Sequence, residues 1–505
     1  MKWIVIAVKW IARLWTLAGD AIRRFDHSMR DRYRPKRLVL AALLVIGLLM
    51  AYMLFFPPCL GLSNDGSLDA VLADVGLTRL DPENKEAYFS YYERTYHIEA
   101  NAQPPGTTPL PLKAMIRLAI GLDILFTNDT LFDMRFLAAL YLVLYLVLLY
   151  PLLLGVMQRV PRYSEGLLLA ILSVLVFADS TIAVRFASLY TSPLETLALI
   201  GFVDIIFVLS RRRQIGAALV LMGVCVAVLT MVNKYCALLG IVVSVVYWRV
   251  FHEQEDLPMR MLSLAMAVVM AALSVVYTGT MLSRQTRVAK YNQMTRGVLF
   301  QADDPVKALA FFGIEPRYSV LTDTYGDQEY PVVLPDDGVL DEGFFDHYST
   351  VDVLGYYLLH PAAVLGMFDR GVHQAFITRS DYSGNYEQRV GLPPRAKTPF
   401  MSIWSTFKEQ SAPKTAGTLL LLAVVILIRK KQSDQEEERR EVRYKELIGV
   451  FIAMAVLEMM VVLLMSGDSE LLRESFLMGM SIDLLSVLFV TELLHRTKRI
   501  ELDKE

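Results

Sequence analysis

Hydrophobic residues gather in long runs along this chain, and short polar or basic segments separate the runs. A run of about 20 apolar residues is long enough to cross a bilayer as a helix. We predict ten such spans, of which some are short: Leu38–Phe56, Phe136–Val156, Glu165–Ala178, Leu194–Leu209, Ile215–Val232, Ala237–Val250, Met261–Met281, Gly417–Ile428, Leu447–Met465 and Phe476–Leu494. The fold class is therefore expected to be an all-α polytopic membrane protein, which also fits a content of 54% hydrophobic residues.

The basic residues predict how these spans are oriented. A cluster of Arg and Lys between Arg30 and Arg37 directly precedes the first span, and such clusters remain in the cytoplasm. Alternating spans then bring the later clusters, Arg211–Arg213 and Arg429–Lys431 among them, to the same side. We expect a multi-pass protein of the bacterial plasma membrane with both termini in the cytoplasm.

The polar segments divide the chain into regions. The predicted regions are a cytoplasmic amphipathic helix and basic segment (1–37), a transmembrane domain (38–283) with a long outer loop (57–134), an extracytoplasmic subdomain (284–415), C-terminal transmembrane helices (416–495) and a cytoplasmic tail (496–505). An amphipathic stretch at Leu112–Leu125 is expected to lie on the outer surface. The subdomain is expected to contain helices at Val306–Phe312, opened by Asp304, and at Val351–Leu365. The mixed charges of Gln435–Lys445 predict a solvated linker.

The loop Gly61–Ser67, just past the first span, is the strongest candidate for chemistry. It contains Asn64 and Asp65 between two glycines, and a carboxylate flanked by glycine can approach a ligand closely. A turn after a helix would have the same composition. Asp65 is predicted to be external, and we expect it to act as a catalytic base that removes a proton from an acceptor hydroxyl.

Other polar residues fall at the outer ends of spans, where a charge needs a partner, water or a function. Taken singly, each fits an ordinary interface position; taken together, on one face, they predict a shared polar cavity. Arg185, Lys234 and Arg473 are cations that could hold a phosphate, and Tyr190 could stack on a sugar ring. The predicted substrate-binding residues are Asn64, Arg185, Tyr190, Glu195, Lys234, Glu470 and Arg473.

Several other kinds of site are missing from the sequence. The chain has three cysteines, too few for a disulfide framework, and two of them fall inside predicted spans. It contains no zinc-ligand spacing, Walker loop or dinucleotide fingerprint. We expect no nucleic-acid partner. The external carboxylate and the cations suit glycosyl transfer from a lipid-phosphate sugar, a donor that carries no nucleotide and needs no such motif.

The order of these features resembles the GT-C superfamily of glycosyltransferases and, more narrowly, the WsfD-type hexose transferases of bacterial surface-glycan biosynthesis. The strings that carry the resemblance are Asn64-Asp65-Gly66, Phe186–Pro193, Asp304-Pro305, Gly384-Asn385-Tyr386, Ser402–Ser405 and Gly467–Arg473. The resemblance departs from the family pattern at Ala187 and at Ser192, where the family has Asn and Glu. Glu195, one helical turn further on, could replace the missing carboxylate.

The resemblance implies an inverting GT-C enzyme that takes a hexose from a polyprenyl-phosphate donor and passes it to a cell-surface glycan acceptor. It also implies that Asp65 matches the acidic residue of the first outer loop that usually serves as the base. Because some members of the superfamily use a divalent cation, a cation held by Asp65 and Glu195 stays open. The sequence identifies no metal ligand set of its own.

Two alternatives remain at this stage. A lipid-linked oligosaccharide flippase or polymerase would share the membrane architecture, but a flippase should show internal repeats and charges facing both sides. We find no repeat, and the unexplained charges cluster on the predicted outer side. A structural membrane scaffold would need none of the polar residues at the span ends.

Overall fold

The computed structural model describes most of the chain and is predominantly helical. The described residues are 10, 24–29, 33–99, 106–127, 130–211, 215–328, 332–379, 383–428 and 434–502. Most of the amphipathic helix predicted within residues 1–37 lies outside these ranges, and so do Arg30 and Arg32 of the basic cluster.

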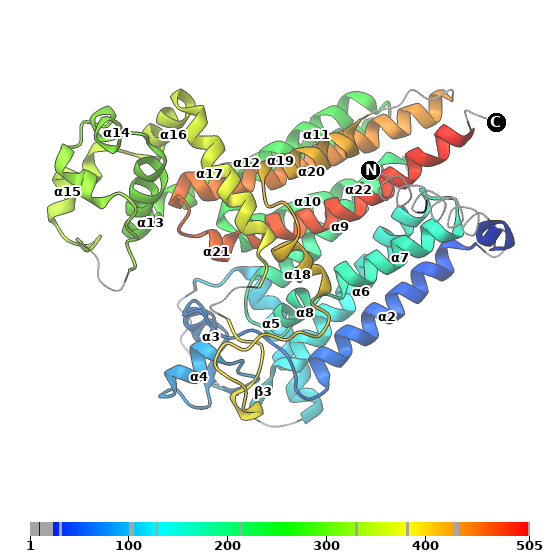
Figure 1. Ribbon diagram of the computed structural model, residues 1–505, viewed down its shortest axis with the longest axis horizontal. Coiled ribbons are helices and arrows are strands. Elements are labelled where there is room, and N and C mark those ends of the chain that lie inside the picture. The colour runs from blue at the N-terminus through cyan, green and yellow to red at the C-terminus, as the bar shows by residue number, and fades with distance from the viewer. Residues whose placement is uncertain are drawn as a thin grey trace.

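Long apolar helices run side by side as a bundle (Figure 1). Among the described residues, eight helical segments are long and apolar enough to cross a membrane, and each coincides with a predicted span. They are α2 (Pro35–Phe55), α6 (Met134–Met157), α9 (Ser192–Ser210), α10 (Ile215–Val232), α11 (Leu239–Glu253) with the preceding 3₁₀ helix η2 (Lys234–Leu238), α12 (Leu257–Ser283), α20 (Gln435–Ser466) and α22 (Phe476–Leu502). This confirms the predicted class, an all-α polytopic membrane protein.

Two of the ten predicted spans are not single helices long enough to cross a membrane. α7 (Tyr163–Phe177) is followed by α8 (Ser180–Phe186) at an angle of 48°. Asp179 lies at the bend and caps α8, because its Oδ1 accepts a hydrogen bond from the Thr181 amide at 2.9 Å. α19 (Ala416–Leu427) has 12 residues, fewer than the roughly 20 that cross a bilayer.

The bundle has two unlike ends. We call the end that carries residues 57–134 and 284–415 the loop end, and the opposite end, where α2 begins and α22 finishes, the terminal end (Figure 1). The 57–134 segment contains α3 (Asp69–Val75), β1 (Leu77–Arg79), α4 (Lys85–Ser90), β2 (Thr95–Ile98), α5 (Leu110–Thr127) and β3 (Leu131–Asp133). The strands form an antiparallel sheet in the order β1-β2-β3, with His97 opposite both Thr78 and Leu131. These strands are too short to produce a clear alternating pattern, and the sequence did not predict them.

The 284–415 segment contains short helices: α13 (Arg287–Asn292), the π-helix η3 (Gln293–Leu299), α14 (Pro305–Phe311), η4 (Pro316–Leu321), α15 (Val339–Gly343), η5 (Phe345–His347), α16 (Thr350–Leu359), α17 (Pro361–Phe376), η6 (Gln388–Val390) and α18 (Ile403–Gln410). Asp304 caps α14 as predicted, since its Oδ1 accepts hydrogen bonds from the amides of Val306 and Lys307.

The prediction of a single helix over Val351–Leu365 is wrong. It is broken at His360, where α16 ends and α17 begins at an angle of 107°. The residue before a proline is driven out of the helical region, and His360 accordingly has φ −123° and ψ 66° before Pro361.

The charged run Gln435–Lys445, predicted to be a solvated helix or coil, forms the first turns of α20 and is largely exposed up to Arg440, but the prediction is wrong at the end of the run. Lys445 is only 2% exposed. Its Nζ lies 2.6 Å from Glu492 Oε1 and 3.3 Å from Glu441 Oε1, while Arg159 Nη2 lies 3.0 Å from Glu441 Oε2 and 3.3 Å from Glu492 Oε2. We call these four residues the terminal cluster; they join the end of α6 to α20 and α22.

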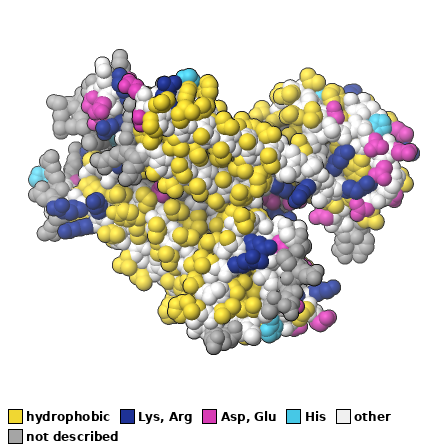
Figure 2. All heavy atoms as spheres, turned by 180° about the vertical axis from the view of Figure 1, so that it is seen from behind, with side chains coloured by type: hydrophobic (Ala, Val, Ile, Leu, Met, Phe, Trp, Pro, Cys, Tyr) yellow, Lys and Arg dark blue, Asp and Glu magenta, His cyan; other side chains and the backbone are white. Residues whose placement is uncertain are grey.

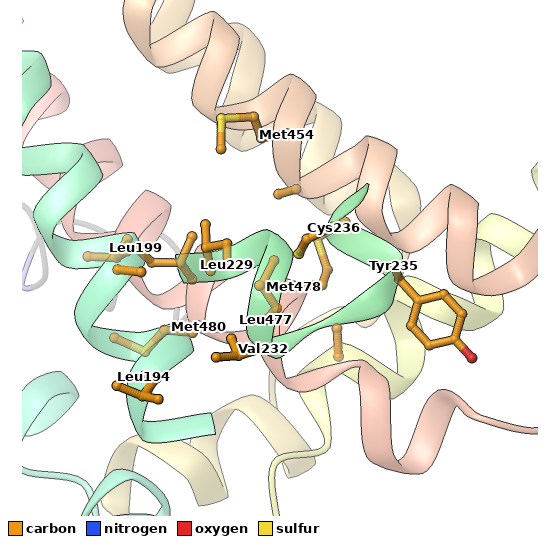
Figure 3. Close-up of a cluster of buried hydrophobic side chains, with 14 of the residues drawn as sticks. Leu194, Leu199, Leu229, Val232, Tyr235, Cys236, Met454, Leu477, Met478 and Met480 are labelled. Atoms are coloured by element: carbon orange, nitrogen blue, oxygen red, sulfur yellow. The ribbon is translucent and has the colours of Figure 1, made fainter. Parts of the chain in front are cut away.

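The hydrophobic core is centred on α9. In its most apolar stretch 94% of the residues are buried by the rest of the protein, against 22% in α12, whose side chains face outward. Gly155 lets α6 approach α9, since a Cβ there would come within 2.8 Å of the Phe207 ring. Figure 3 shows side chains from α9, α10, η2, α20 and α22 meeting in this core: Leu194, Leu199, Leu229, Val232, Tyr235, Cys236, Met454, Leu477, Met478 and Met480.

Candidate functional site at the loop end

The Gly61–Ser67 loop folds into two successive turns held by its own side chains. Asn64 Oδ1 accepts a hydrogen bond from the Gly66 amide at 2.7 Å, and Gly66 takes a positive φ of 92°. Asp65 Oδ1 accepts from the amide of Ser67 at 2.9 Å and from its hydroxyl at 2.5 Å. Asn and Asp commonly form turns of this kind, which leave the second carboxylate oxygen of Asp65 facing outward from the turn.

Residues far along the chain fix this loop in place. The Gly61 amide donates to Asn385 O at 3.1 Å, and the Ser63 amide donates to Gly384 O at 3.0 Å. In return, the Gly384 amide donates to Ser63 Oγ at 2.9 Å. A Cβ on Gly384 would lie 2.2 Å from Ser90 O, so only glycine fits at this crossing. The string Gly384-Asn385-Tyr386 therefore supports the Asp65 loop through its backbone.

A cavity of about 290 Å³ opens beside this loop. Its wall combines the 57–134 segment, the α8–α9 turn, the 378–397 stretch and the α20–α22 connection. Five of the predicted site residues line it, and they come from three separate parts of the chain: Asp65, Arg185, Tyr190, Glu195 and Arg473.

Asp65 is tied to two other cavity residues. Its amide donates to Tyr190 Oη at 2.9 Å, and Tyr190 donates in turn to Ser63 O at 3.1 Å. Arg473 Nε lies 3.3 Å from Asp65 Oδ2. Burial alone would raise the pKa of Asp65, but the hydrogen bonds from Ser67 and the charge of Arg473 outweigh it and hold the pKa below its ordinary value. Asp65 is therefore ionised at neutral pH.

Deeper in the cavity, Arg185 and Glu195 face the same space. Arg185 Nη1 donates to Ser192 Oγ at 3.3 Å, and its guanidinium stacks 4.0 Å above the Phe476 ring. Glu195 is 5% exposed and accepts a hydrogen bond from Thr191 Oγ1 at 2.9 Å. Ser192 and Glu195 lie one helical turn apart at the start of α9, and both line the cavity. Glu195 can therefore present a carboxylate close to the position that Ser192 leaves without one.

Three predicted site residues lie outside the cavity wall. Asn64 is buried and shapes the turn through Gly66. Lys234 is exposed, with its Nζ 4.8 Å from the Tyr235 ring centroid. Glu470 Oε2 lies 3.8 Å from Arg473 Nη1. Their predicted roles in substrate binding stay predictions.

The structure adds residues that the sequence did not single out. Arg379, Lys397 and Glu474 all line the cavity, and so does Asn385, which the sequence had marked only as part of the resemblance. Burial, and then the nearby carboxylate of Glu195, raise the pKa of Glu474 to about 8, against the opposing effect of Lys234. Glu474 directly follows Arg473, and this adjacency is the only sequence signal that could have identified it.

A search of the described residues for metal sites finds no group of three or more His, Cys, Asp or Glu side chains that could hold a metal ion. The Asp65 carboxylate already engages Arg473 and Ser67. The cavity combines the ionised carboxylate of Asp65 with three guanidinium groups, the amino group of Lys397 and two further carboxyl groups. Such a set can bind an anion and accept a proton at the same place.

Comparisons with known proteins yield one match. A family model described as the YfdI N-terminal transmembrane domain matches residues 23–505, nearly the whole chain. No curated protein and no solved structure matches the chain. The narrower likeness to WsfD-type transferases finds no support among these comparisons and stays a prediction.

Proposed function

The chain belongs to the YfdI N-terminal transmembrane domain family, a family related to GT-C-like membrane glycosyltransferases, and from this premise we propose that it is a hexosyltransferase. It transfers a hexose from a polyprenyl-phosphate donor to a cell-surface glycan acceptor, on the outer face of the bacterial plasma membrane. One observation supports this proposal above all: Asp65 and Arg473 meet at the mouth of a cavity that also contains Arg185 and Glu195.

The two arginines suit the donor. A sugar phosphate linked to a lipid carries its charge beside the bond that breaks, and guanidinium groups bind phosphate in a fixed planar geometry. Arg473 is half-exposed at the mouth, whereas Arg185 lies further inside, stacked on Phe476. Both can stabilise the negative charge that develops on the phosphate as the sugar leaves.

Asp65 suits the acceptor. The acceptor oxygen attacks C1 of the hexose from the face opposite the phosphate, and the C1–O bond breaks with its electron pair passing to the phosphate. The hydroxyl proton of the acceptor moves to Asp65, and the configuration at C1 is inverted. A phosphate that draws Arg473 away would remove one cause of the low pKa of Asp65, so donor binding makes this carboxylate a stronger base.

The donor class can be tested directly. Membranes that contain the protein are incubated with radiolabelled polyprenyl-phosphate hexoses and, in parallel, with the same hexoses as nucleotide diphosphates. We expect label to enter the glycan fraction from the lipid-linked donors only. Transfer from the nucleotide sugar alone would contradict the proposal, as would movement of intact lipid-linked glycan without release of polyprenyl phosphate.

The role of Asp65 has its own test. We expect Asp65→Asn to lower the rate of transfer by about 10²–10⁴-fold, the usual contribution of a general base. The asparagine oxygen can still accept the hydrogen bonds from Ser67, so folding should be retained. Asp81→Asn is the matched control, because Asp81 is an exposed carboxylate of the same segment outside the cavity wall. Near-normal transfer by Asp65→Asn would disprove the assignment of the base.

A further inference from the structure

The bend between α16 and α17 exposes a large apolar surface. We call residues 351–365 the elbow; five of its aliphatic side chains are exposed to a large extent: Val351 (71%), Leu354 (44%), Leu358 (75%), Leu359 (68%) and Leu365 (67%). The sequence between Asp352 and Asp369 contains no Asp, Glu, Lys or Arg. Exposed apolar clusters of this kind are rare in contact with water and mark binding surfaces.

The elbow begins where two spanning helices end. Thr350 Oγ1 donates to Gln285 Oε1 at 3.3 Å and accepts from Gln293 Nε2 at the same distance. These two glutamines also donate to the last carbonyls of α20, Gln285 to Met465 O at 3.0 Å and Gln293 to Leu464 O at 2.6 Å. Gln285 itself comes just after α12. The first residue of α16 is thus fixed at the loop-end boundary of the bundle.

The far side of the elbow returns to the bundle. Gly371 of α17 packs on α20, because a Cβ there would come within 2.7 Å of Met459 Sδ. Met459 lies about two turns before the end of α20 at Ser466. The elbow is therefore attached on both sides to the part of the bundle next to the loop end. Together α16 and α17 are apolar enough to cross a membrane, but their 107° bend prevents a straight span.

Hydrophobic side chains form a continuous surface from the bundle to this region. In Figure 2 they cover the bundle and continue over the upper edge of the smaller lobe. The outward face of α12, with Val268, Val269, Val275 and Val276 exposed, belongs to the surface that meets lipid. The exposed aliphatic residues of the elbow extend that surface past the ends of the spanning helices.

We propose that the elbow is a membrane-binding device, which inserts Leu358, Leu359 and Leu365 among the acyl chains of the leaflet at the loop end. Its partner is the phospholipid bilayer itself. The acyl chains cover side chains that would otherwise face water, and the lack of charged residues between Asp352 and Asp369 permits their insertion. α17 is followed by Thr378 and Arg379, which line the cavity, and further on by Gly384 and Asn385, whose carbonyls hold the Asp65 loop. The elbow therefore anchors this part of the cavity wall to the membrane surface.

The test measures the depth of labels on the full-length protein. Cys59, Cys225 and Cys236 are replaced by alanine, and single cysteines are introduced as Leu358→Cys, Leu365→Cys and, as an aqueous control, Glu342→Cys on exposed α15. Each variant is labelled with an environment-sensitive fluorophore in vesicles of phosphatidylethanolamine and phosphatidylglycerol. The quenchers are lipids with spin labels along the acyl chain, and iodide in the buffer.

We expect lipid quenchers to suppress the labels at 358 and 365 and to place them about 5–10 Å into the boundary of headgroups and acyl chains, with little effect of iodide. The label at 342 should show the reverse. Iodide quenching at 358 and 365 as strong as at 342 would overturn the proposal. Should the label disturb the fold of a variant, incorporation of a photoreactive amino acid at position 358 provides a second measurement. Crosslinking to phospholipid is expected there, and crosslinking to protein alone would overturn the proposal.

Discussion

The two ends of the helix bundle each bring together a group of charged side chains, but the groups differ in how their charges are balanced. In the terminal cluster, Glu441 and Glu492 each lie within 3.3 Å of both Arg159 and Lys445, so two anions meet two cations. In the loop-end cavity, Glu195 and Glu474 have no cation within ion-pair distance among the described residues, and Asp65 meets one arginine from one side. A buried carboxylate is costly without a partner.

This difference in charge balance distinguishes a structural site from a functional site. The terminal cluster is complete as it stands and joins three helices, so a ligand would have nothing to add. Of the described carboxyl groups in the cavity, only Asp65 contacts a cation, Arg473, while Glu195 and Glu474 do not, and a ligand with a phosphate and hydroxyl groups would complete the contacts of this set. Substitutions at the terminal end should therefore affect stability, and substitutions at the loop end should affect transfer.

The largest difference is expected between two conservative changes, Glu492→Gln and Glu195→Gln. Glu492→Gln leaves Lys445 and Arg159 with a single anion, and breaking a buried pair in this way costs about 3–5 kcal/mol of stability. Glu195→Gln replaces a buried carboxyl group that has no cation at contact distance, so we expect a change of about 1 kcal/mol or less.

Thermal unfolding in detergent measures both variants, and transfer per folded molecule is measured beside it. The comparison predicts that Glu492→Gln keeps its transfer rate but unfolds at a lower temperature. Glu195→Gln should keep its unfolding temperature but lose transfer. It would fail if both variants lost stability to the same extent.

A smaller effect is expected for Arg473→Gln. Charge-assisted hydrogen bonds to phosphate contribute about 1.5–3 kcal/mol, so the KM for the lipid-phosphate donor should rise about 10- to 100-fold. Removing Arg473 also removes one cause of the low pKa of Asp65, so the acid limb of the pH–rate profile should move to higher pH. Arg317→Gln, an exposed arginine outside the cavity wall, serves as the control. An unchanged KM together with an unchanged acid limb would show that Arg473 neither binds the donor nor lowers the pKa of Asp65.

The smallest effect concerns Glu474. Because its pKa is raised to about 8, the side chain is neutral at pH 7 and gains its negative charge as the pH passes through 8. A new negative charge beside the donor phosphate should raise the KM by a few fold, about 1 kcal/mol for unit charges in a partly solvated site. Glu474→Gln should abolish this alkaline rise while its KM at pH 7 stays near that of the wild type. If the KM of Glu474→Gln still rises at alkaline pH, another titrating group causes the rise.

The sequence predicted the parts of the fold that depend on local hydrophobic runs. Each predicted span corresponds to an apolar helix, and Asp304 caps α14 as expected. The break at His360 was missed because the apolar pattern continues across Pro361, although the proline itself was a visible signal. The burial of Lys445 was missed because its nearer partner Glu492 belongs to another helix, α22, and the local charge pattern shows only Glu441 one turn away.

Only part of the candidate site was predicted, namely the part that depends on the local sequence. Asp65, Arg185, Glu195 and Arg473 were selected because each is a polar residue at the end of a span, a property of the local sequence. The backbone pairing of Gly61 and Ser63 with Gly384 and Asn385 joins segments more than 300 residues apart, as the separation of 321 between Ser63 and Gly384 shows. Contacts of that kind depend on the packed bundle, and a single sequence does not reveal them.

The most direct test of the account is a structure of the protein in lipid nanodiscs with bound polyprenyl phosphate, the product of the proposed reaction. The account predicts that the phosphate lies in the loop-end cavity within hydrogen-bonding distance of Arg473 or Arg185, and that the contact between Arg473 and Asp65 at 3.3 Å is broken. A phosphate bound elsewhere on the protein, with the Arg473–Asp65 contact intact, would contradict the central claim that this cavity is the transfer site.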